Sequence, residues 1–306
     1  MTVIINFGII TFANLSNSTK DEGATMVKII IDSAADISKS EAESLGIEMI
    51  PVIISFGDKD YYDGENLTAT EFYEKLASSS VVPKTAQVNP FRWEEAFTRH
   101  IESGDEVLVI TMSSKLSGTY QSACQASEKF NGKVRVIDSL NACAGERLLC
   151  EYAISLVKQG LSLNEIAYKL EENKKRIRVL AVIGTLEYLK KGGRISAVAA
   201  FAGEILSLKP LIAVIDGEVK VTGKAMGFRK GLALLNKQID DTKGIDFSMP
   251  ISAIYSGETE NLEKFIQTSQ RIWDNVSGEI PKSQLGATIG THIGPGVAGI
   301  SFFEIQ

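Results

Sequence analysis

Hydroxyl-bearing residues gather in one short stretch of the chain. Residues 105–123 read DEVLVITMSSKLSGTYQSA, in which a buried-type strand at 107–111 leads into a loop that contains Ser113, Ser114, Ser117, Gly118 and Thr119. A helix is predicted to begin near Thr119. Free backbone N–H groups and the helix dipole at such a junction favour a bound anion. Capping needs only one hydroxyl, so we expect residues 113–119, called the serine loop below, to hold an anionic head group.

Three further residues are of types that interact with an anion. His292 lies between glycines in GTHIGPG, after a predicted strand at 285–290, and an imidazole can donate to a carboxylate or a phosphate. Arg194 follows a basic helix end, and Arg229 belongs to a basic cluster between Lys224 and Lys230. A structural hydrogen bond for the histidine and a solvated surface for the basic residues are the simpler alternatives.

Two standard catalytic or nucleotide-binding patterns are missing. Gly217-x5-Gly223-Lys224 has one residue too many for a P-loop, and Ala225 follows where Ser or Thr is required. There is also no Gly-x-Ser-x-Gly nucleophile elbow. Ser117 and His292 can still meet in space, so a serine-dependent hydrolase stays open. A regulatory module that binds a phosphorylated small molecule stays open as well.

Composition excludes several classes of protein. The 306 residues carry a net charge of −6, which argues against a nucleic-acid-binding protein. No apolar run approaches the roughly 20 residues of a membrane helix. Only two histidines are present, which excludes a His-rich metal site, and we expect no metal and no cofactor. The three cysteines lack metal-ligand spacing and are odd in number, which is typical of a reducing cytoplasm.

Strands and helices alternate in the first half of the chain. Apolar strands are predicted at 27–31, 47–55, 107–111 and 134–137, and helices at 38–45, 68–77, 89–101, 119–130, 145–158 and 163–174. This alternation predicts right-handed crossovers and a mostly parallel sheet. Asp32-Ser33, the serine loop and Asp138-Ser139 each follow a strand. Ligands bind at the carboxyl ends of parallel strands, so we expect the site there.

The second half of the chain shows a different pattern. Asp216-Gly217 suits a type I′ turn and predicts a β-hairpin over 211–222. The other predicted strands are 178–183, 251–255, 285–290 and 300–305, and the predicted helices are 185–191, 196–206, 227–239 and 260–274. We therefore predict an α/β protein of two domains: an N-terminal domain at 26–174 with a mostly parallel sheet and flanking helices, and a C-terminal domain at 175–306 with a mixed sheet. Residues 1–25 are expected to be a disordered extension or to follow from an upstream start codon.

Several short motifs, taken in order, resemble those of the DegV family, which includes the fatty-acid-binding subunits of bacterial fatty-acid kinase. The motifs are Asp32-Ser33-x-x-Asp36, Thr85-x-Gln87, Ser113-Ser114-x-Leu116-Ser117-Gly118-Thr119-Tyr120-Gln121-Ser122, Asp138-Ser139, Leu186-x-x-Leu189-x-x-Gly192-Gly193-Arg194-Ile195, Lys209-Pro210 and His292-x-Gly294-Pro295-Gly296. Each motif is weak alone, but their order and spacing are specific, and the resemblance extends from Met26 to the end of the chain.

The resemblance implies a carrier that buries one long-chain fatty acid, such as palmitate, between its two lobes. The carboxylate would be held by residues of three segments: Thr85, Ala86, Ser117, Gly118, Thr119 and His292. Arg194 and Arg229 would lie near the carboxylate or at a docking surface. A separate kinase subunit would phosphorylate the bound acid to an acyl phosphate, so the chain would have no activity of its own.

The resemblance has further implications and two exceptions. It implies a cytoplasmic monomer with at most transient membrane contact, and a tunnel whose far end is lined by helices such as 163–174 and 196–206. Ala86 and Val88 follow Thr85 where the family usually has Ser and Pro, which removes one hydroxyl from the carboxylate site. Met226 stands where many members have Arg, which bears on docking to a kinase.

Overall fold

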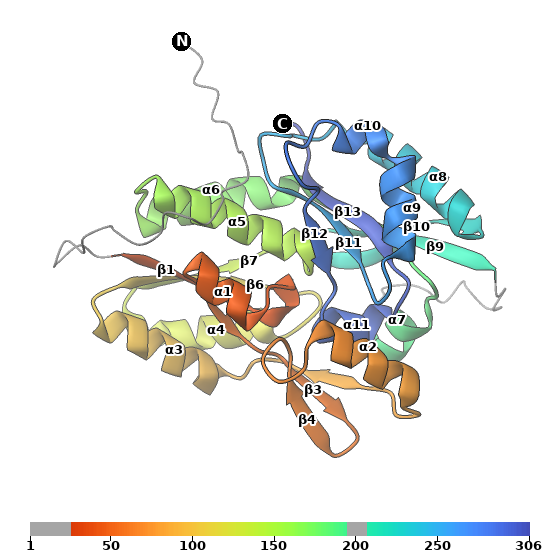
Figure 1. Cartoon of the computed structure of the whole chain (residues 1–306). Coiled ribbons are helices and arrows are strands. Elements are labelled where there is room, and N and C mark those ends of the chain that lie inside the picture. Colours follow the sequence, from red (N-terminus) through yellow and green to blue (C-terminus); the bar gives the residue numbers. More distant parts are fainter. Residues whose placement is uncertain (1–25, 195–206) are drawn as a thin grey trace, which may run out of the picture.

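The computed structural model describes residues 26–194 and 207–306. Figure 1 shows three sheets with helices around and between them. The first sheet has four parallel strands in the order β2-β1-β6-β7. Its strands are β1 (Val27–Asp32), β2 (Glu48–Ile50), β6 (Glu106–Thr111) and β7 (Val134–Asp138). The parallel N-terminal sheet that the alternation predicts is confirmed.

The second sheet has six strands in the order β10-β9-β8-β13-β11-β12, of which only β11 and β12 pair in parallel. Its strands are β8 (Ile177–Val182), β9 (Leu208–Ile215), β10 (Glu218–Met226), β11 (Ile251–Tyr255), β12 (Lys282–Gln284) and β13 (Ala298–Phe303). The predicted mixed sheet is thus confirmed. At the turn between β9 and β10, Asp216 and Gly217 both have positive φ, 52° and 82°, as a type I′ turn requires.

A third, antiparallel sheet of three strands was not predicted. It consists of β3 (Ile53–Phe56), β4 (Lys59–Tyr62) and β5 (Lys84–Ala86), in the order β4-β3-β5. The predicted strand 47–55 is wrong as a single element, because its first part forms β2 and its last part forms β3. Pro51 has no N–H to donate to a ladder, and the Val52 N–H donates to Ser33 Oγ at 3.0 Å. The chain therefore leaves one sheet and enters another at this point.

The helices mostly follow their sequence signals. They are α1 (Lys39–Leu45), α2 (Ala69–Ser78), α3 (Pro90–Glu102), α4 (Thr119–Ser127), α5 (Ala144–Lys158), α6 (Leu163–Asn173), α7 (Glu187–Gly192), α8 (Phe228–Asp240), α9 (Glu260–Thr268), α10 (Gln270–Trp273) and α11 (Ala287–Ile293). The capping box of Thr68 and Glu71 opens α2, and Asn89 caps α3. The predicted helix 260–274 is divided at Ser269 into α9 and α10. The predicted helix 196–206 and the extension 1–25 lie outside the described residues.

The predicted strand 285–290 is wrong, because most of this segment belongs to the helix α11. The apolar run from Leu285 to Ile289 suggested a strand, and the N-cap residue Gly286 has no side chain for capping. The N–H groups of the first helical turn are instead bound by two carboxylates far away in the chain. Asp63 accepts from Ala287 and Thr288, and Asp36 accepts from Gly286.

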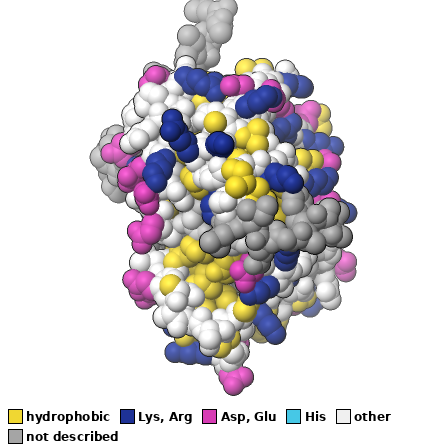
Figure 2. All heavy atoms as spheres, turned by 90° about the vertical axis from the view of Figure 1, so that its right-hand side faces the viewer, with side chains coloured by type: hydrophobic (Ala, Val, Ile, Leu, Met, Phe, Trp, Pro, Cys, Tyr) yellow, Lys and Arg dark blue, Asp and Glu magenta, His cyan; other side chains and the backbone are white. Residues whose placement is uncertain are grey.

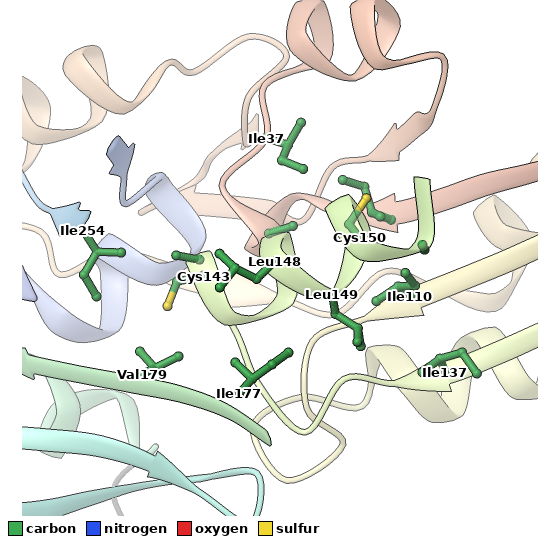
Figure 3. Packing of buried hydrophobic residues seen from close by; sticks show 14 of the residues in the cluster. Ile37, Ile110, Ile137, Cys143, Leu148, Leu149, Cys150, Ile177, Val179 and Ile254 are labelled. Carbon is green, nitrogen blue, oxygen red and sulfur yellow. The ribbon is translucent and has the colours of Figure 1, made fainter. Parts of the chain in front are cut away.

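Helix α5 joins the two larger sheets. It contacts β1 and β6 on one side and β8, β11 and β13 on the other, and one cluster of buried hydrophobic residues runs through these elements. Figure 3 shows Leu148, Leu149 and Cys150 of α5 between Ile110 and Ile137 of the parallel sheet and Ile177 of the second sheet. The predicted domain boundary near residue 175 thus lies beside a shared core. No helix among the described residues is long and apolar enough to cross a membrane.

Candidate functional site

An apolar cavity of about 300 Å³ lies between the carboxyl end of the parallel sheet and one face of the six-stranded sheet. Val52, Met112 and Ala142 line it shortly after the ends of β2, β6 and β7. Opposite walls come from β8, β9 and β10, where alternate residues face the same side of the sheet. The volume is at the lower end of the range for small-molecule sites. Its position matches the general rule for ligands of parallel sheets.

Thr85 and His292 meet at one end of this cavity. Thr85 Oγ1 and His292 Nε2 are 2.9 Å apart, although 207 residues separate them in the chain. Strand β5 positions Thr85, and α11 positions His292. Both residues line the cavity, as does Ala86. The sequence motifs that contain these residues therefore come together at one polar end.

The serine loop contributes Ser117 and Gly118 to the same cavity. Ser117 Oγ lies 2.9 Å from Thr119 Oγ1 and accepts from the Thr119 N–H at 3.2 Å. Thr119 itself is fully buried and is not among the cavity-lining residues. Ser113 is also buried, and its hydroxyl donates to Gly217 O in the β9–β10 turn at 2.8 Å. Ser117 is therefore the hydroxyl of this loop that a ligand can meet.

Aspartates at the strand ends hold the serine loop in place. Asp32 Oδ2 accepts from the Met112 N–H at 2.9 Å, and Asp138 Oδ1 accepts from the Ser114 N–H at 3.2 Å. The three polar strand ends thus lie together, as the parallel sheet predicts. Burial raises the pKa of Asp32 to about 7, against the lowering effect of its hydrogen bonds from Met112 and Ala34. These aspartates support the site rather than line it.

Arg194 lies at the cavity and Arg229 does not. Arg194 lines the cavity, with Nε donating to Leu116 O at 3.2 Å and a terminal nitrogen donating to Gly192 O at 2.6 Å. Arg229 is exposed in the first turn of α8 and is absent from the cavity wall. The two arginines that the resemblance groups together are therefore separate in the structure.

His292 is neutral in this setting. Burial lowers its pKa to about 4, and the nearby charge of Arg194 adds to this shift. Its other nitrogen, Nδ1, is buried without a hydrogen-bond partner. The polar end therefore offers two hydroxyls, one neutral imidazole and one guanidinium. This set can donate several hydrogen bonds to a carboxylate and supplies one positive charge.

Sequence reasoning missed the apolar walls of the cavity. They come from residues on strands and on α11, including Val179, Ala181, Ile212, Val214, Val219, Leu285, Ile289 and Ile293. The spacing of Ile289, His292 and Ile293 is that of one helix face, and this signal was available in the sequence. The expected lining by helix 163–174 is wrong for the described part of the chain, because α6 contributes no residue to the cavity.

The hydrolase arrangement is not assembled here. Ser117 Oγ is hydrogen bonded to Thr119, and His292 Nε2 to Thr85, rather than to each other. In a serine hydrolase the base accepts directly from the nucleophile. The described residues also hold no cluster of three His, Cys, Asp or Glu side chains suited to a metal ion.

The face with β10 and α8 is rich in basic side chains. Figure 2 shows this face, on which hydrophobic side chains and Lys and Arg side chains both lie above and below the grey segment. Lys224 on β10 and Arg229 and Lys230 at the start of α8 are exposed. The cluster that the sequence singles out thus lies at the surface.

The sequence of this chain is similar to proteins of one family over nearly its whole length. Residues 26–304 match the model described as an uncharacterised protein of the DegV family. A DegV domain-containing protein of Caldanaerobacter subterraneus subsp. tengcongensis is 35% identical over 280 residues, 91% of this chain and 99% of that protein.

Solved structures share the fold over nearly the same length. A fatty-acid-binding DegV family protein from Thermus thermophilus is 30% identical, with a TM-score of 0.83 over 92% of this chain and 100% of that chain. A stearic-acid-binding protein from Eubacterium ventriosum is 26% identical, with a TM-score of 0.78 over 91% of this chain and 98% of that chain.

Proposed function

Because the chain belongs to the DegV family, we propose that it binds one long-chain fatty acid in the cavity described above. The carboxylate lies at the end formed by Thr85, Ser117 and His292, and the hydrocarbon chain lies along the apolar walls. The observation that carries this proposal is the junction of a polar end and an apolar interior within one cavity. The related fatty-acid-binding protein from Thermus thermophilus and stearic-acid-binding protein from Eubacterium ventriosum support it.

The energetics of a bound acid agree with this arrangement. Each buried methylene contributes about 0.8 kcal/mol, so a 16-carbon chain contributes up to about 12 kcal/mol before the entropy of association is subtracted. A buried carboxylate is costly unless several donors bind it. Ser117, Thr85 and the Arg194 guanidinium are such donors, and Arg194 balances the charge.

Lipid extraction tests this proposal directly. Mass spectrometry of the organic extract of purified protein should show long-chain fatty acids, and palmitate added to delipidated protein should bind. Ser117→Ala should weaken palmitate binding, whereas Ser114→Ala, its neighbour outside the cavity wall, should not. A protein that holds no lipid and has no affinity for palmitate would show the proposal to be wrong.

We further propose that the protein presents the bound acid to a separate kinase subunit and performs no chemistry alone. The bound carboxylate would attack the γ-phosphate of ATP on the kinase, giving an acyl phosphate and ADP. The exposed basic face with Arg229 and Lys230 is the candidate docking surface. Met226, exposed on the adjoining strand, is the departure from the family pattern there.

Reconstitution with a purified fatty-acid kinase subunit tests this second step. ATP and palmitate should give an acyl phosphate, detected as a hydroxamate with hydroxylamine, only when both proteins are present. Arg229→Glu with Lys230→Glu should reduce this product without a change in palmitate affinity. Product formed without the kinase, or covalent labelling of Ser117 by a fluorophosphonate, would favour an enzyme instead. Tight binding of a sugar phosphate or nucleotide in calorimetry would favour the regulatory module.

A further inference from the structure

Two buried carboxylates bind the first turn of α11. Asp63 Oδ1 accepts from the Ala287 N–H at 3.0 Å, and its Oδ2 accepts from the Thr288 N–H at 3.0 Å. The Thr288 hydroxyl also donates to Asp63 Oδ2. Asp36 Oδ1 accepts from the Gly286 N–H at 2.7 Å. Asp63 is only 3% exposed, so these bonds are shielded from water.

Helix α11 depends on such external partners. It has seven residues, and a helix of that length does not form stably on its own. Its cap residue Gly286 supplies no side-chain acceptor. The direction of the helix axis is therefore set by what binds its first N–H groups. Because Ile289, His292 and Ile293 all line the cavity, that direction decides where the imidazole points.

Asp63 also binds a second segment of the cavity wall. Its N–H donates to Val52 O at 3.1 Å, and Val52 lines the cavity. Ser33 Oγ lies 3.3 Å from Thr288 Oγ1 and accepts from the Val52 N–H at 3.0 Å. One connected group of Asp63, Ser33 and Thr288 thus links the end of β1, the segment before β3, and α11.

From these contacts we propose that Asp63 is a positioning residue of the carboxylate site. It fixes the first turn of α11 and thereby keeps His292 against Thr85, without touching the ligand itself. This inference rests on the proposed function, because it assigns a role within the same site. Asp63 does not line the cavity, so its effect on a ligand passes through the lining residues that it binds, Thr288 of α11 and Val52.

The test compares two ligands that differ only in their head group. Asp63→Asn places an amide NH₂ against a helix N–H group, whereas Asp58→Asn makes the same change in the exposed β3–β4 turn. Asp63→Asn should weaken palmitate binding by about tenfold, equivalent to about 1.4 kcal/mol. It should weaken the binding of hexadecanol, which lacks the carboxylate but contacts the same apolar walls, by a clearly smaller factor. Equal weakening for both ligands would mean a merely structural role and would overturn the inference.

A second readout needs no ligand. The chain has two histidines, so the Cε1–H region of the carbon-proton spectrum contains two imidazole signals, one from His292 and one from His100. Asp63→Asn should shift the His292 signal and leave the His100 signal in place. An unshifted His292 signal in folded Asp63→Asn would contradict the inference. This measurement stays decisive even if the unchanged protein fails to bind palmitate, an outcome that refutes only the proposed function.

A milder pair of variants covers the case in which Asp63→Asn does not fold. Thr288→Val removes one of the three hydrogen bonds to Asp63, and Thr288→Ser retains it. Because Thr288 itself lines the cavity, the readout for this pair is the His292 signal of the ligand-free protein, which Thr288→Val should shift and Thr288→Ser should leave in place. Equal behaviour of the two variants would overturn the inference.

Discussion

At the scale of single residues, His292 and Arg194 have different roles at the polar end of the cavity. The imidazole is neutral near pH 7, because burial and the charge of Arg194 lower its pKa to about 4. A neutral ring forms one hydrogen bond with Thr85 but does not compensate an anion. The positive charge that a bound carboxylate needs therefore comes from Arg194, which lines the same cavity.

The protonation of His292 should respond to the ligand. A bound carboxylate favours the charged imidazole, so palmitate should raise the pKa of His292 above about 4. Nuclear magnetic resonance titration with and without palmitate measures this shift, and His292→Gln assigns the signal. Without ligand, the unfolded chain takes up the proton near pH 6.5 and the folded chain only near pH 4. Stability should therefore fall as the pH drops through this window, and His292→Gln should remove that part of the fall.

Glu146 is a buried acid without a partner. It is fully buried, and neither carboxylate oxygen has a hydrogen bond. Burial, together with the charges of Asp32, Asp36 and Asp138, raises its pKa well above the ordinary value. This acid is consequently neutral in the folded protein at a pH where it is ionised in the unfolded chain.

Glu146→Gln should stabilise the protein increasingly as the pH rises. Below pH 4.5 the carboxyl is protonated in both the folded and the unfolded chain, so its ionisation contributes little to the effect of the substitution on stability. Above it, the unfolded chain releases the proton and the folded chain does not. Between the pKa of Glu146 in the unfolded chain and its pKa in the folded chain, each pH unit lowers the free energy of unfolding of the unchanged protein by roughly 1.4 kcal/mol. Urea unfolding at pH 5 and pH 8 measures the difference, and an equal gain at both would contradict the assignment.

At the scale of elements, α11 shows where sequence reasoning succeeds and fails. The helices α2 and α3 were predicted because their caps, Thr68 and Asn89, lie beside them in the sequence. The sequence of α11 predicts a strand instead of a helix, because its capping carboxylates lie 224 and more residues away in the chain. The apolar run 47–55 predicts one strand, but Pro51 cannot donate to a ladder and separates β2 from β3. Local signals thus predict most elements. The prediction for α11 fails because its capping partners are distant in the chain, and the prediction for 47–55 fails at the local signal of Pro51.

Gly290→Ala tests how tightly α11 is seated. A Cβ at Gly290 would lie 2.5 Å from Phe72 Cε1 and 2.8 Å from Tyr73 Oη. These buried side chains of α2 have little room to move, so the variant should lose about 2 kcal/mol of stability and bind palmitate more weakly. Gly231→Ala in α8 meets Val182 Cγ1 at 2.9 Å, away from the cavity wall.

Comparing Gly290→Ala with Gly231→Ala distinguishes a general loss of stability from a change at the ligand site. Both variants should unfold at lower urea concentration, but only Gly290→Ala should lose palmitate affinity in calorimetry. Unchanged affinity in Gly290→Ala would show that the cavity tolerates a shift of α11.

At the scale of the whole molecule, the cavity is built from both larger sheets. The class of fold, both sheet types and the motifs at the polar end followed from the sequence. The cavity itself did not, because Val179, Val214 and Val219 reach it only through the pairing and twist of distant strands. The Ser113 hydroxyl connects the two larger sheets, because it follows β6 and donates to Gly217 O in the β9–β10 turn.

Removing the hydrogen bond between Ser113 and Gly217 should speed the release of the bound fatty acid. Ser113→Ala leaves the Gly217 carbonyl without its donor and should cost about 1 kcal/mol of stability. Because the β9–β10 hairpin forms one wall of the cavity, a fluorescent fatty acid should dissociate faster in stopped-flow measurements. Ser114→Ala is the matched control, since its contact to Asp138 is made by the backbone N–H. Equal release rates in the two variants would contradict this role.

The distant caps of α11 also impose an order on biosynthesis. A ribosome makes the chain from its N-terminus, and N-terminal segments fold first. Asp36 and Asp63 therefore leave the ribosome more than 200 residues before the helix whose N–H groups they bind. The nascent chain contains these acceptors long before their partners are made, and the polar end that needs Thr85 and His292 together forms only after His292 has left the ribosome.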